Sequence, residues 1–306
     1  MNAAISIEHL AKRYGNVTAV RELSLSVNSG EIAGLIGADS AGKTTAIRMI
    51  CGLLKPDSGT VKIAGFVLPQ GQKAVKDHLG YMPQRFSLYP DLTVEENIHF
   101  FADLYQIPKK QRLERIDQLY HFSKLGPFRE RRAGRLSGGV KQKLALCCNL
   151  IHEPDVMILD EPTFGVDPVS RRELWDILHS LRERGTALLV STAYLDEAEW
   201  CDSIHLMHEG QIIASGALEE LLQRYPYRLS EVVAENHTRQ EFDAVRHELM
   251  QIHEIAHVHR FGDRLHVAYQ SEVQEHSIHA IATHAAMQVY PVKPILEDLF
   301  VTLVTA

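Results

Sequence analysis

The stretch Gly37-Ala-Asp-Ser-Ala-Gly-Lys-Thr-Thr45, GADSAGKTT in one-letter code, decides how the surrounding chain must fold. It fits G-x-x-x-x-G-K-[ST], a pattern in which glycines let backbone N–H groups close around phosphate oxygens. The Lys43 ammonium is expected to reach the β and γ oxygens of a nucleotide, and the Thr44 hydroxyl to ligate Mg²⁺. Nucleotide contacts are expected along the whole loop, from Gly37, Ala38, Asp39, Ser40, Ala41, Gly42, Lys43, Thr44 and Thr45.

The text on either side of this loop agrees with that reading. The apolar run EIAGLI precedes the loop, and a segment with helical periodicity follows it to about Leu54. A buried strand would therefore lead through the loop into a helix N-terminus, whose positive end also favours phosphate.

A second chemical signal lies in VMILDEP, Val156 to Pro162. An apolar strand would deliver Asp160 to the carboxyl edge of a parallel sheet, where such sheets bind ligands and where Asp160 can hold Mg²⁺ through water. The adjacent Glu161 is placed to orient or deprotonate an attacking water. Alone, the pattern would indicate only a strand that ends in an acidic turn. After a phosphate-binding loop, it indicates the metal and water side of the same site.

The segment Leu136-Ser-Gly-Gly139 stands just before the helical text VKQKLALCC. A serine and two glycines at a helix N-terminus form a second anion-binding end. Because this chain already has one phosphate loop, Ser137, Gly138 and Gly139 are expected to serve the nucleotide of a neighbouring subunit.

The arrangement of strand-like and helix-like text predicts two domains. Strands and helices alternate over most of residues 1–222, which indicates an α/β domain with a mostly parallel sheet. Residues of about 86–152 read almost entirely as helix and form a helical insert. The text QRYPYRLS breaks the pattern, and residues 223–306 read as a small α+β domain: a helix, a hairpin, another helix, a strand and a helical tail.

The motifs GADSAGKTT, YMPQ, LSGG, ILDEP and GVDP follow one another in this order. In that order and rough spacing they resemble the ATP-binding subunit of an ABC transporter, from Ile5 to about Leu222. The resemblance implies a P-loop NTPase fold of the ABC type with a helical insert. It also implies ATP and Mg²⁺ as cofactors.

The resemblance assigns further roles, residue by residue. Tyr14 would stack on adenine, and Gln84 would sense the γ-phosphate and Mg²⁺, as both a catalytic and a metal-site residue. Ser137 would reach the ATP of the opposing subunit, and Asp167 would lie in the loop that joins the two sites. Two cassettes would close head to tail over two Mg-ATP molecules.

The sequence also departs from the family pattern. Asp39 and Ser40 stand where the family usually has Asn-Gly, which puts a carboxylate beside the phosphate loop. Val140 stands where Gln or Met commonly follows LSGG. In LLVSTAYLDEAE, Ala193 stands where the family usually has histidine. The chain's own ATP site is therefore expected to be degenerate, and pairing with a second, different cassette is favoured over a homodimer.

Composition restricts the possible partners and the cellular location of the chain. The net charge of −7 over 306 residues argues against a nucleic-acid partner. The four cysteines show no CxxC spacing, which fits a reducing cytoplasm. No segment approaches the roughly 20 apolar residues needed to cross a bilayer, so any membrane role must come from a partner. The expected location is the cytoplasm, peripheral to the inner face of the cell membrane.

One motif points elsewhere. His253-Glu-Ile-Ala-His257 matches H-E-x-x-H, a zinc-binding pattern that needs a helix to bring both histidines to one metal. This segment runs into a hairpin, and on a strand the two rings would lie about 13 Å apart. No zinc site is expected here.

The predicted function is ATP binding and hydrolysis that power a separate membrane permease. The text RFSLYPDLTVEEN and the tail PILEDLF resemble the drug-export type, and TAYLDEAE resembles the N-terminal cassettes of tandem export ATPases. The RFSLYPDL segment would touch the permease. Two alternatives stay open: a soluble ABC protein acting on ribosomes or nucleic acid, and a regulatory subunit that binds ATP with little turnover.

Overall fold

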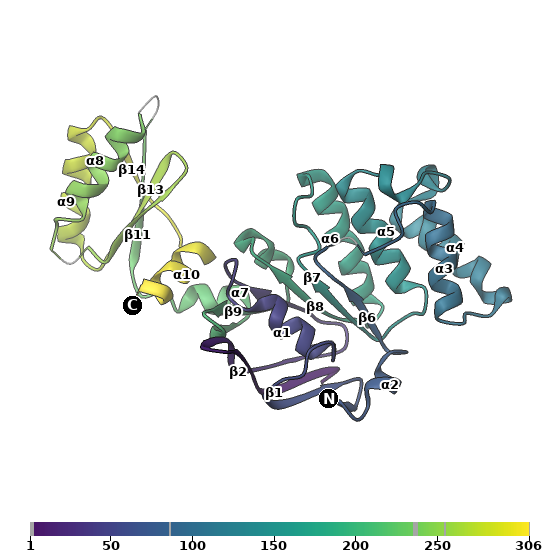
Figure 1. Ribbon diagram of the computed structural model, residues 1–306. Helices are drawn as coiled ribbons and strands as arrows, with labels where there is room; N and C mark the ends of the chain where they lie inside the picture. Colours follow the sequence, from purple (N-terminus) through teal and green to yellow (C-terminus); the bar gives the residue numbers. More distant parts are fainter. Residues whose placement is uncertain (1–2, 86, 235–237, 254, 306) are drawn as a thin grey trace. The chain divides into compact units, whose positions relative to one another are not determined.

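The structure is a computed structural model that describes residues 3–85, 87–234, 238–253 and 255–305. The chain divides into two compact units, Met1–Leu218 and Glu219–Ala306. The division falls at the start of α7 (Leu218–Gln223), the helix whose end marks the domain boundary expected from sequence. Figure 1 shows the elements of each unit.

The first unit contains a six-stranded sheet that carries the phosphate-loop strand near its middle. Its strand order is β10-β9-β3-β8-β7-β6, and all pairs are parallel except β10 with β9. Strands β3, β7 and β8 are buried along their whole length, which explains their continuous apolar text. The strands are β3 (Ile32–Ile36), β6 (Leu79–Met82), β7 (Val156–Asp160), β8 (Ala187–Thr192), β9 (Ser203–His208) and β10 (Gln211–Gly216).

A second, antiparallel sheet in this unit has the order β2-β1-β4-β5. The sequence pattern does not distinguish this sheet from the parallel one. Its strands alternate between buried and exposed residues, as expected of antiparallel strands with one solvated face. The strands are β1 (Ile5–Tyr14), β2 (Val17–Val27), β4 (Ser58–Ile63) and β5 (Phe66–Leu68).

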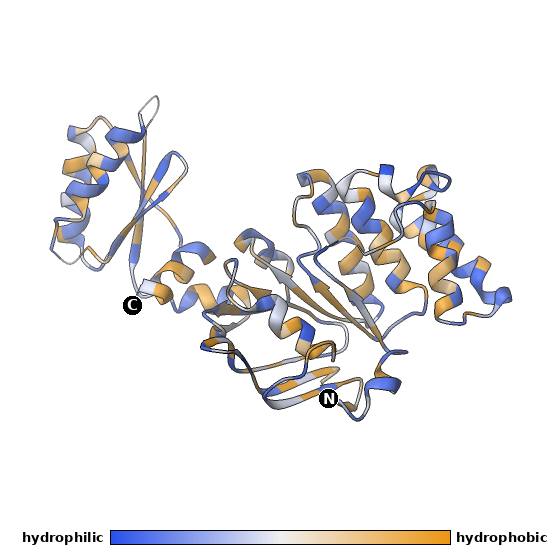
Figure 2. Ribbon diagram, viewed as in Figure 1, coloured by the Kyte–Doolittle hydropathy of each residue, from blue (hydrophilic) through white to orange (hydrophobic). Residues whose placement is uncertain are grey.

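The two faces of the parallel sheet pack against different partners. On β8, Leu188 and Val190 belong to the core formed with the helical insert and α6, whereas Ala187 and Leu189 belong to the core formed with α1 and the antiparallel sheet. This is the period of two expected of a strand buried on both faces. Figure 2 shows the hydrophobic colouring of these central strands.

The helices of the first unit include the expected helical insert. The insert consists of α3, α4 and α5, and α3 begins with a capping box between Thr93 and Glu96. The text LDEAEW after β8 forms the 3₁₀ helix η3. The helices are α1 (Lys43–Ile50), α2 (Gln72–Val75), α3 (Val94–Leu104), α4 (Lys109–Ser123), α5 (Gly138–Leu150), α6 (Pro168–Glu183), η1 (Gly126–Phe128), η2 (Ala133–Arg135) and η3 (Leu195–Trp200).

The second unit has the strand and helix order β-α-β-β-α-β, followed by one more helix. Its strands form an antiparallel sheet in the order β12-β13-β11-β14, the ferredoxin-like split βαβ arrangement. Strand β11, which was not predicted from the sequence, lies inside this sheet. The elements are β11 (Arg228–Val233), α8 (Arg239–Leu249), β12 (His257–Phe261), β13 (Arg264–Tyr269), α9 (Glu272–His284), β14 (Gln288–Pro291) and α10 (Leu296–Thr305).

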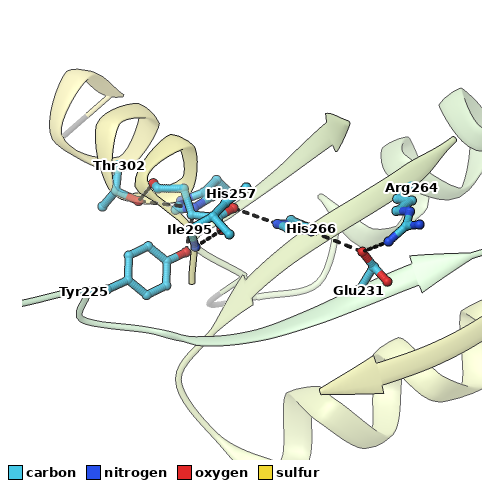
Figure 3. Close-up of polar contacts among 8 residues, drawn as sticks. Tyr225, Glu231, His257, Arg264, His266, Ile295 and Thr302 are labelled. Atoms are coloured by element: carbon cyan, nitrogen blue, oxygen red, sulfur yellow. Dashed lines mark hydrogen bonds and ion pairs between the residues drawn. The ribbon is translucent and has the colours of Figure 1, made fainter. Parts of the chain in front are cut away.

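The last helix of the second unit is tied to its sheet by a buried polar cluster. Asp298 of α10 is fully buried and accepts a hydrogen bond from His266 of β13 at 2.8 Å. Thr302 of α10 contacts His257 of β12 at 3.3 Å, and the Tyr225 hydroxyl lies 3.2 Å from the same ring nitrogen. Figure 3 shows His257 beside Tyr225 and Thr302, with His266 also joined to Glu231.

Candidate active site

Two glycines of the Gly37–Thr45 loop are required by close backbone contacts. A Cβ atom at Gly37 would lie 2.1 Å from the carbonyl oxygen of Met207, and one at Gly42 would lie 2.3 Å from that of Ala19. Gly42 also has φ 106°, which favours glycine. Helix α1 begins directly after Gly42 without a side-chain cap. Its first N–H groups therefore face the loop without intrahelical partners.

Lys43 lies buried at the centre of this loop. Its Nζ donates to the carbonyl oxygens of Gly37 at 2.7 Å and Ala38 at 3.0 Å. The same nitrogen lies 3.2 Å from Glu161 Oε1. The ammonium thus joins the phosphate-type loop to the acidic end of β7.

Asp160, the last residue of β7, has one satisfied and one unsatisfied oxygen. Its Oδ1 accepts hydrogen bonds from Ser191 Oγ at 2.7 Å and Thr44 Oγ1 at 3.2 Å. Its Oδ2 is buried and has no hydrogen-bond partner among the described residues. Burial raises the pKa of Asp160, against the hydrogen bonds from Ser191 and Thr44. A buried carboxylate oxygen without a donor fits a bound cation, because it otherwise carries an uncompensated desolvation cost.

Glu161 is held on both sides. Its Oε2 accepts from Gln84 Nε2 at 2.9 Å, and its Oε1 faces Lys43. Its backbone has φ 50°, and its N–H donates to the backbone oxygen and hydroxyl of Ser191 at 3.1 and 3.0 Å. Strain of this kind persists where the surrounding structure fixes it, often at functional sites. The sequence-predicted Lys43, Gln84 and Glu161 thus meet at one carboxylate.

Lys43, Thr44, Gln84 and Glu161 line one cavity of about 570 Å³. Sequence reasoning missed Arg21 and Glu209 in its wall, because they come from β2 and from the turn between β9 and β10, where no motif marks them. Tyr14 does not line the cavity. It ends β1, is 51% exposed, and pairs in register with Val17, which does line the cavity. The lining residues are Val17, Thr18, Ala19, Arg21, Asp39, Ser40, Gly42, Lys43, Thr44, Thr45, Gln84, Glu161, Glu209 and Gly210.

The LSGG segment lies outside this cavity. Ser137 is the exposed N-cap residue of α5, and its side chain makes no capping hydrogen bond. A Cβ at Gly139 would lie 2.3 Å from the Cβ of Ser170, so glycine is needed where α5 meets α6. Asp167 caps α6 by accepting a hydrogen bond from Ser170 N at 2.9 Å. Hydrogen bonds from the backbone and side chain of Ser170 lower the pKa of Asp167. LSGG and the Asp167 segment therefore adjoin each other, as two parts of one surface.

Ala193 follows directly on the buried strand β8. The residue before it, Thr192, accepts a backbone hydrogen bond from Gly37 N at 3.2 Å. Position 193 therefore lies beside both the phosphate-type loop and the Glu161 segment. The neighbouring side chains are occupied elsewhere: Thr192 Oγ1 accepts from Tyr194 N at 3.0 Å, and the Tyr194 ring lies under the guanidinium of Arg171 at 4.4 Å.

The H-E-x-x-H pattern does not lie on a helix. His253 precedes β12 and His257 begins it, while Glu254 lies outside the described residues. Within the described ranges no group of three His, Cys, Asp or Glu residues is placed to hold a metal ion. His257 contacts Tyr225 and Thr302 instead.

Comparison with known proteins decides the family. The profile described as "ABC transporter" matches residues 20–164. Over 222 residues the chain is 39% identical to "Nod factor export ATP-binding protein I" of Burkholderia orbicola (strain AU 1054), which covers 72% of this chain and 73% of that protein. The chain belongs to the family of ABC transporter ATP-binding proteins.

Two further matches agree. The chain is 48% identical over 224 residues to the "Probable multidrug ABC transporter ATP-binding protein YbhF" of Escherichia coli (strain K12), and it spans 39% of that relative's length and 72% of its own. A solved "ATP binding subunit of ABC transporter" superposes with a TM-score of 0.66 at 29% identity, covering 72% of this chain and 93% of the other. The P-loop NTPase fold expected from sequence is confirmed. None of the helices in the described ranges combines the length and apolar character needed to cross a bilayer.

Proposed function

We propose that this ABC ATPase binds Mg-ATP in the 570 Å³ cavity and uses its hydrolysis to power a separate membrane permease of the export type. The observation that carries the proposal is the convergence of Lys43, Gln84 and Glu161, which brings a phosphate ligand, a γ-phosphate sensor and a water-orienting carboxylate within hydrogen-bond distance. The names of the relatives support export, since one is a multidrug and one a Nod factor export protein.

Each residue has a proposed role. Lys43 and the N–H groups of the loop from Gly37 to Thr45 bind the β- and γ-phosphates. Thr44, Gln84 and Asp160 would hold Mg²⁺, and the ion would supply positive charge to the phosphate oxygens. Glu161 orients the attacking water. Tyr14, at the rim beside Val17, stacks on the adenine ring.

A second cassette completes the arrangement. We propose that Ser137, Gly138 and Gly139 bind the ATP of that partner through the exposed N-terminus of α5. Asp167 lies in the adjoining segment and would face the partner's site.

Ala193 makes a pair of two different cassettes the favoured assembly. A polar side chain at this position would reach a γ-phosphate, and alanine offers none. Thr192 and Tyr194 are engaged with backbone and with Arg171, which argues against either replacing it. The chain would hold ATP durably at its own loop, while Ser137 completes a faster site on a partner that retains histidine.

A groove beside the helical insert is the proposed docking site for the permease. It has a volume of about 740 Å³, and its walls include Leu53, Leu79, Tyr81, Leu104 and Tyr105. Leu53 and Leu104 are 62% and 60% exposed, which is unusual for residues of this size clustered at one groove. The RFSLYPDL segment would lie at the same interface, although its Phe86 is outside the described residues. Docking here would place the cassette peripherally on the inner face of the membrane.

Co-purification from membranes tests this proposal. The tagged chain is expected to bring an integral membrane protein with it, and mass spectrometry would identify that protein. Leu53→Glu with Leu104→Glu should abolish this association but keep ATP binding, because both residues lie outside the nucleotide cavity. Leu113→Glu, at another highly exposed leucine on the insert, serves as a matched control. Association that survives the paired substitution would contradict the docking site, and a soluble ribosomal or nucleic-acid partner would contradict the transport function.

A further inference from the structure

Glu197 carries an unusual buried charge just beyond Ala193. It lies on η3, its side chain is fully buried, and neither carboxylate oxygen has a hydrogen-bond partner among the described residues. The nearest cation is Arg171, whose Nε lies 3.7 Å from Oε1, outside hydrogen-bond distance. A buried carboxylate in this state is costly, and an apolar residue would commonly be more stable there.

Other unsatisfied polar atoms surround the same carboxylate. Thr163 Oγ1, Trp175 Nε1 and Arg171 Nε are also buried without hydrogen-bond partners in the described part of the chain. Burial raises the pKa of Glu197, while Thr192, Thr163 and Trp175 lower it from their places around the carboxylate. Donors and acceptor are therefore neighbours whose hydrogen bonds are incomplete.

The donors come from three segments that frame the proposed ATP site. Thr163 follows Glu161 by two residues, and Thr192 immediately precedes Ala193. Trp175 and Arg171 lie one helical turn apart on α6, which begins directly after Asp167. Arg171 is itself fixed to the segment after Ala193, through Asp196 at 3.1 Å and the ring of Tyr194. The Glu197 carboxylate thus adjoins the segment after Glu161, the segment around Ala193, and helix α6, whose N-cap residue is Asp167.

We propose that Glu197 is a positioning residue that couples occupancy of the ATP site to α6. With Mg-ATP bound, the segment from Glu161 to Thr163 closes on the nucleotide, and Glu197 accepts the hydrogen bonds of Thr163 and Trp175. Helix α6 and Asp167 then take the position that a second cassette recognises. The inference rests on the proposed ATP site. The hydrogen bonds of Glu197 would connect the Glu161–Thr163 segment to α6 without any contribution from the side chain at position 193.

The two tryptophans of the chain, Trp175 and Trp200, make the test direct. Their ring centroids are 5.3 Å apart, so both would report on this region, and Trp200→Phe leaves Trp175 as the single tryptophan. In that background, Mg-ATP should shift the emission of Trp175, because its indole N–H gains a partner. Glu197→Gln should lose most of this shift, with the Kd for ATP changed by less than about threefold, since Glu197 does not touch the nucleotide. Thr163→Val provides a second variant if Glu197→Gln does not fold, and a partial loss of the shift is expected.

Two controls separate the possible failures. Glu199→Gln, at an exposed glutamate two residues further on, should keep the full shift. Lys43→Ala should lose ATP binding itself, measured by calorimetry. Two outcomes with normal ATP binding would contradict the coupling: an unchanged shift of Trp175 emission in Glu197→Gln, or no shift in the chain that carries only Trp200→Phe. Neither outcome would contradict the proposed ATP site. Absence of ATP binding by the parent chain would overturn the proposed function instead.

Discussion

At the residue scale, Ala193 is expected to lower the rate of ATP hydrolysis at this chain's own site. A group that stabilises transition-state charge or orients the attacking water commonly contributes on the order of 10² to 10³ in rate. Ala193→His should therefore raise steady-state ATP hydrolysis by the purified chain by about 10-fold or more, with Glu161→Gln in the same background as the inactive control. A chain that already turns over fast, and that neither the histidine nor an added partner cassette accelerates, would contradict the asymmetric assembly.

The site shows at this scale which residues sequence can predict. The positions of Lys43 and Thr44 were predictable from spacing along one strand, loop and helix, and those of Asp160 and Glu161 from the end of an apolar strand; the structure brings these two segments together. Arg21 and Glu209 enter the cavity wall only through the pairing of distant segments, as in the hydrogen bond from Arg21 N to Gly210 O at 2.6 Å.

Glu197 escaped prediction for another reason. The acidic text DEAE reads as a solvated face, and nothing local in that text indicates that one of its carboxylates is buried against α6.

At the element scale, the second unit depends on how α10 is tied to its sheet. Asp298 accepts from His266 with Oδ1 and from Ile295 N with Oδ2 at 2.9 Å, so one carboxylate holds both the sheet and the start of the helix. Burial lowers the pKa of His266, but the hydrogen bond and charge of Asp298, together with Glu231, outweigh it and raise the pKa above its ordinary value. The charged pair is therefore favoured in the folded unit.

The sign of the pH dependence follows. Because the folded pKa of His266 is raised, its stabilising contribution is complete below the ordinary value of 6.5 and is lost as pH rises through the folded pKa. Asp298→Asn should reduce the local stability of α10 by about 1–3 kcal/mol near pH 6, and by less near pH 9.

Amide hydrogen exchange of residues 296–305, compared with the parent chain at each pH, measures this difference. His266→Gln is the matched variant and should remove the pH dependence. A difference in the local stability of α10 between the parent chain and Asp298→Asn that stays constant or grows with pH would contradict a charged His266–Asp298 pair. Burial lowers the pKa values of His257 and His259, whereas the charge of Asp298 raises them, so Asp298→Asn also shifts the titration of these two rings to lower pH.

The elements themselves were mostly readable from sequence. Helix α3, with its capping box, and the β12–β13 hairpin, with its Gly262-Asp263 turn, carry local signals. Strand β11 was not predicted because QRYPYRLS has the composition of a break between domains, and its text RLSEVV becomes a strand through pairing with β13 and β14.

At the scale of the whole molecule, the chain is two units with separate cores. A chain shortened to end at Leu222 is expected to stay soluble and to bind ATP with a Kd within about threefold of the parent, because no residue of the cavity comes from the second unit. Nucleotide titration and size-exclusion chromatography check both points. Aggregation of the shortened chain, or loss of its ATP binding, would show that the cassette needs the second unit.

The central claim, that the cavity of the first unit is an ATP-hydrolysing site with separate binding and water-side residues, has one direct test. Nucleotide titration with Mg²⁺ compares the parent chain with Lys43→Ala and Glu161→Gln. Lys43 lies inside the loop and should contact phosphate, so Lys43→Ala should weaken ATP binding by at least about 10-fold. Glu161 should act on the water, so Glu161→Gln should keep binding within about threefold of the parent while hydrolysis is lost. Equal loss of ATP binding in both variants, or unchanged binding by Lys43→Ala, would contradict the account.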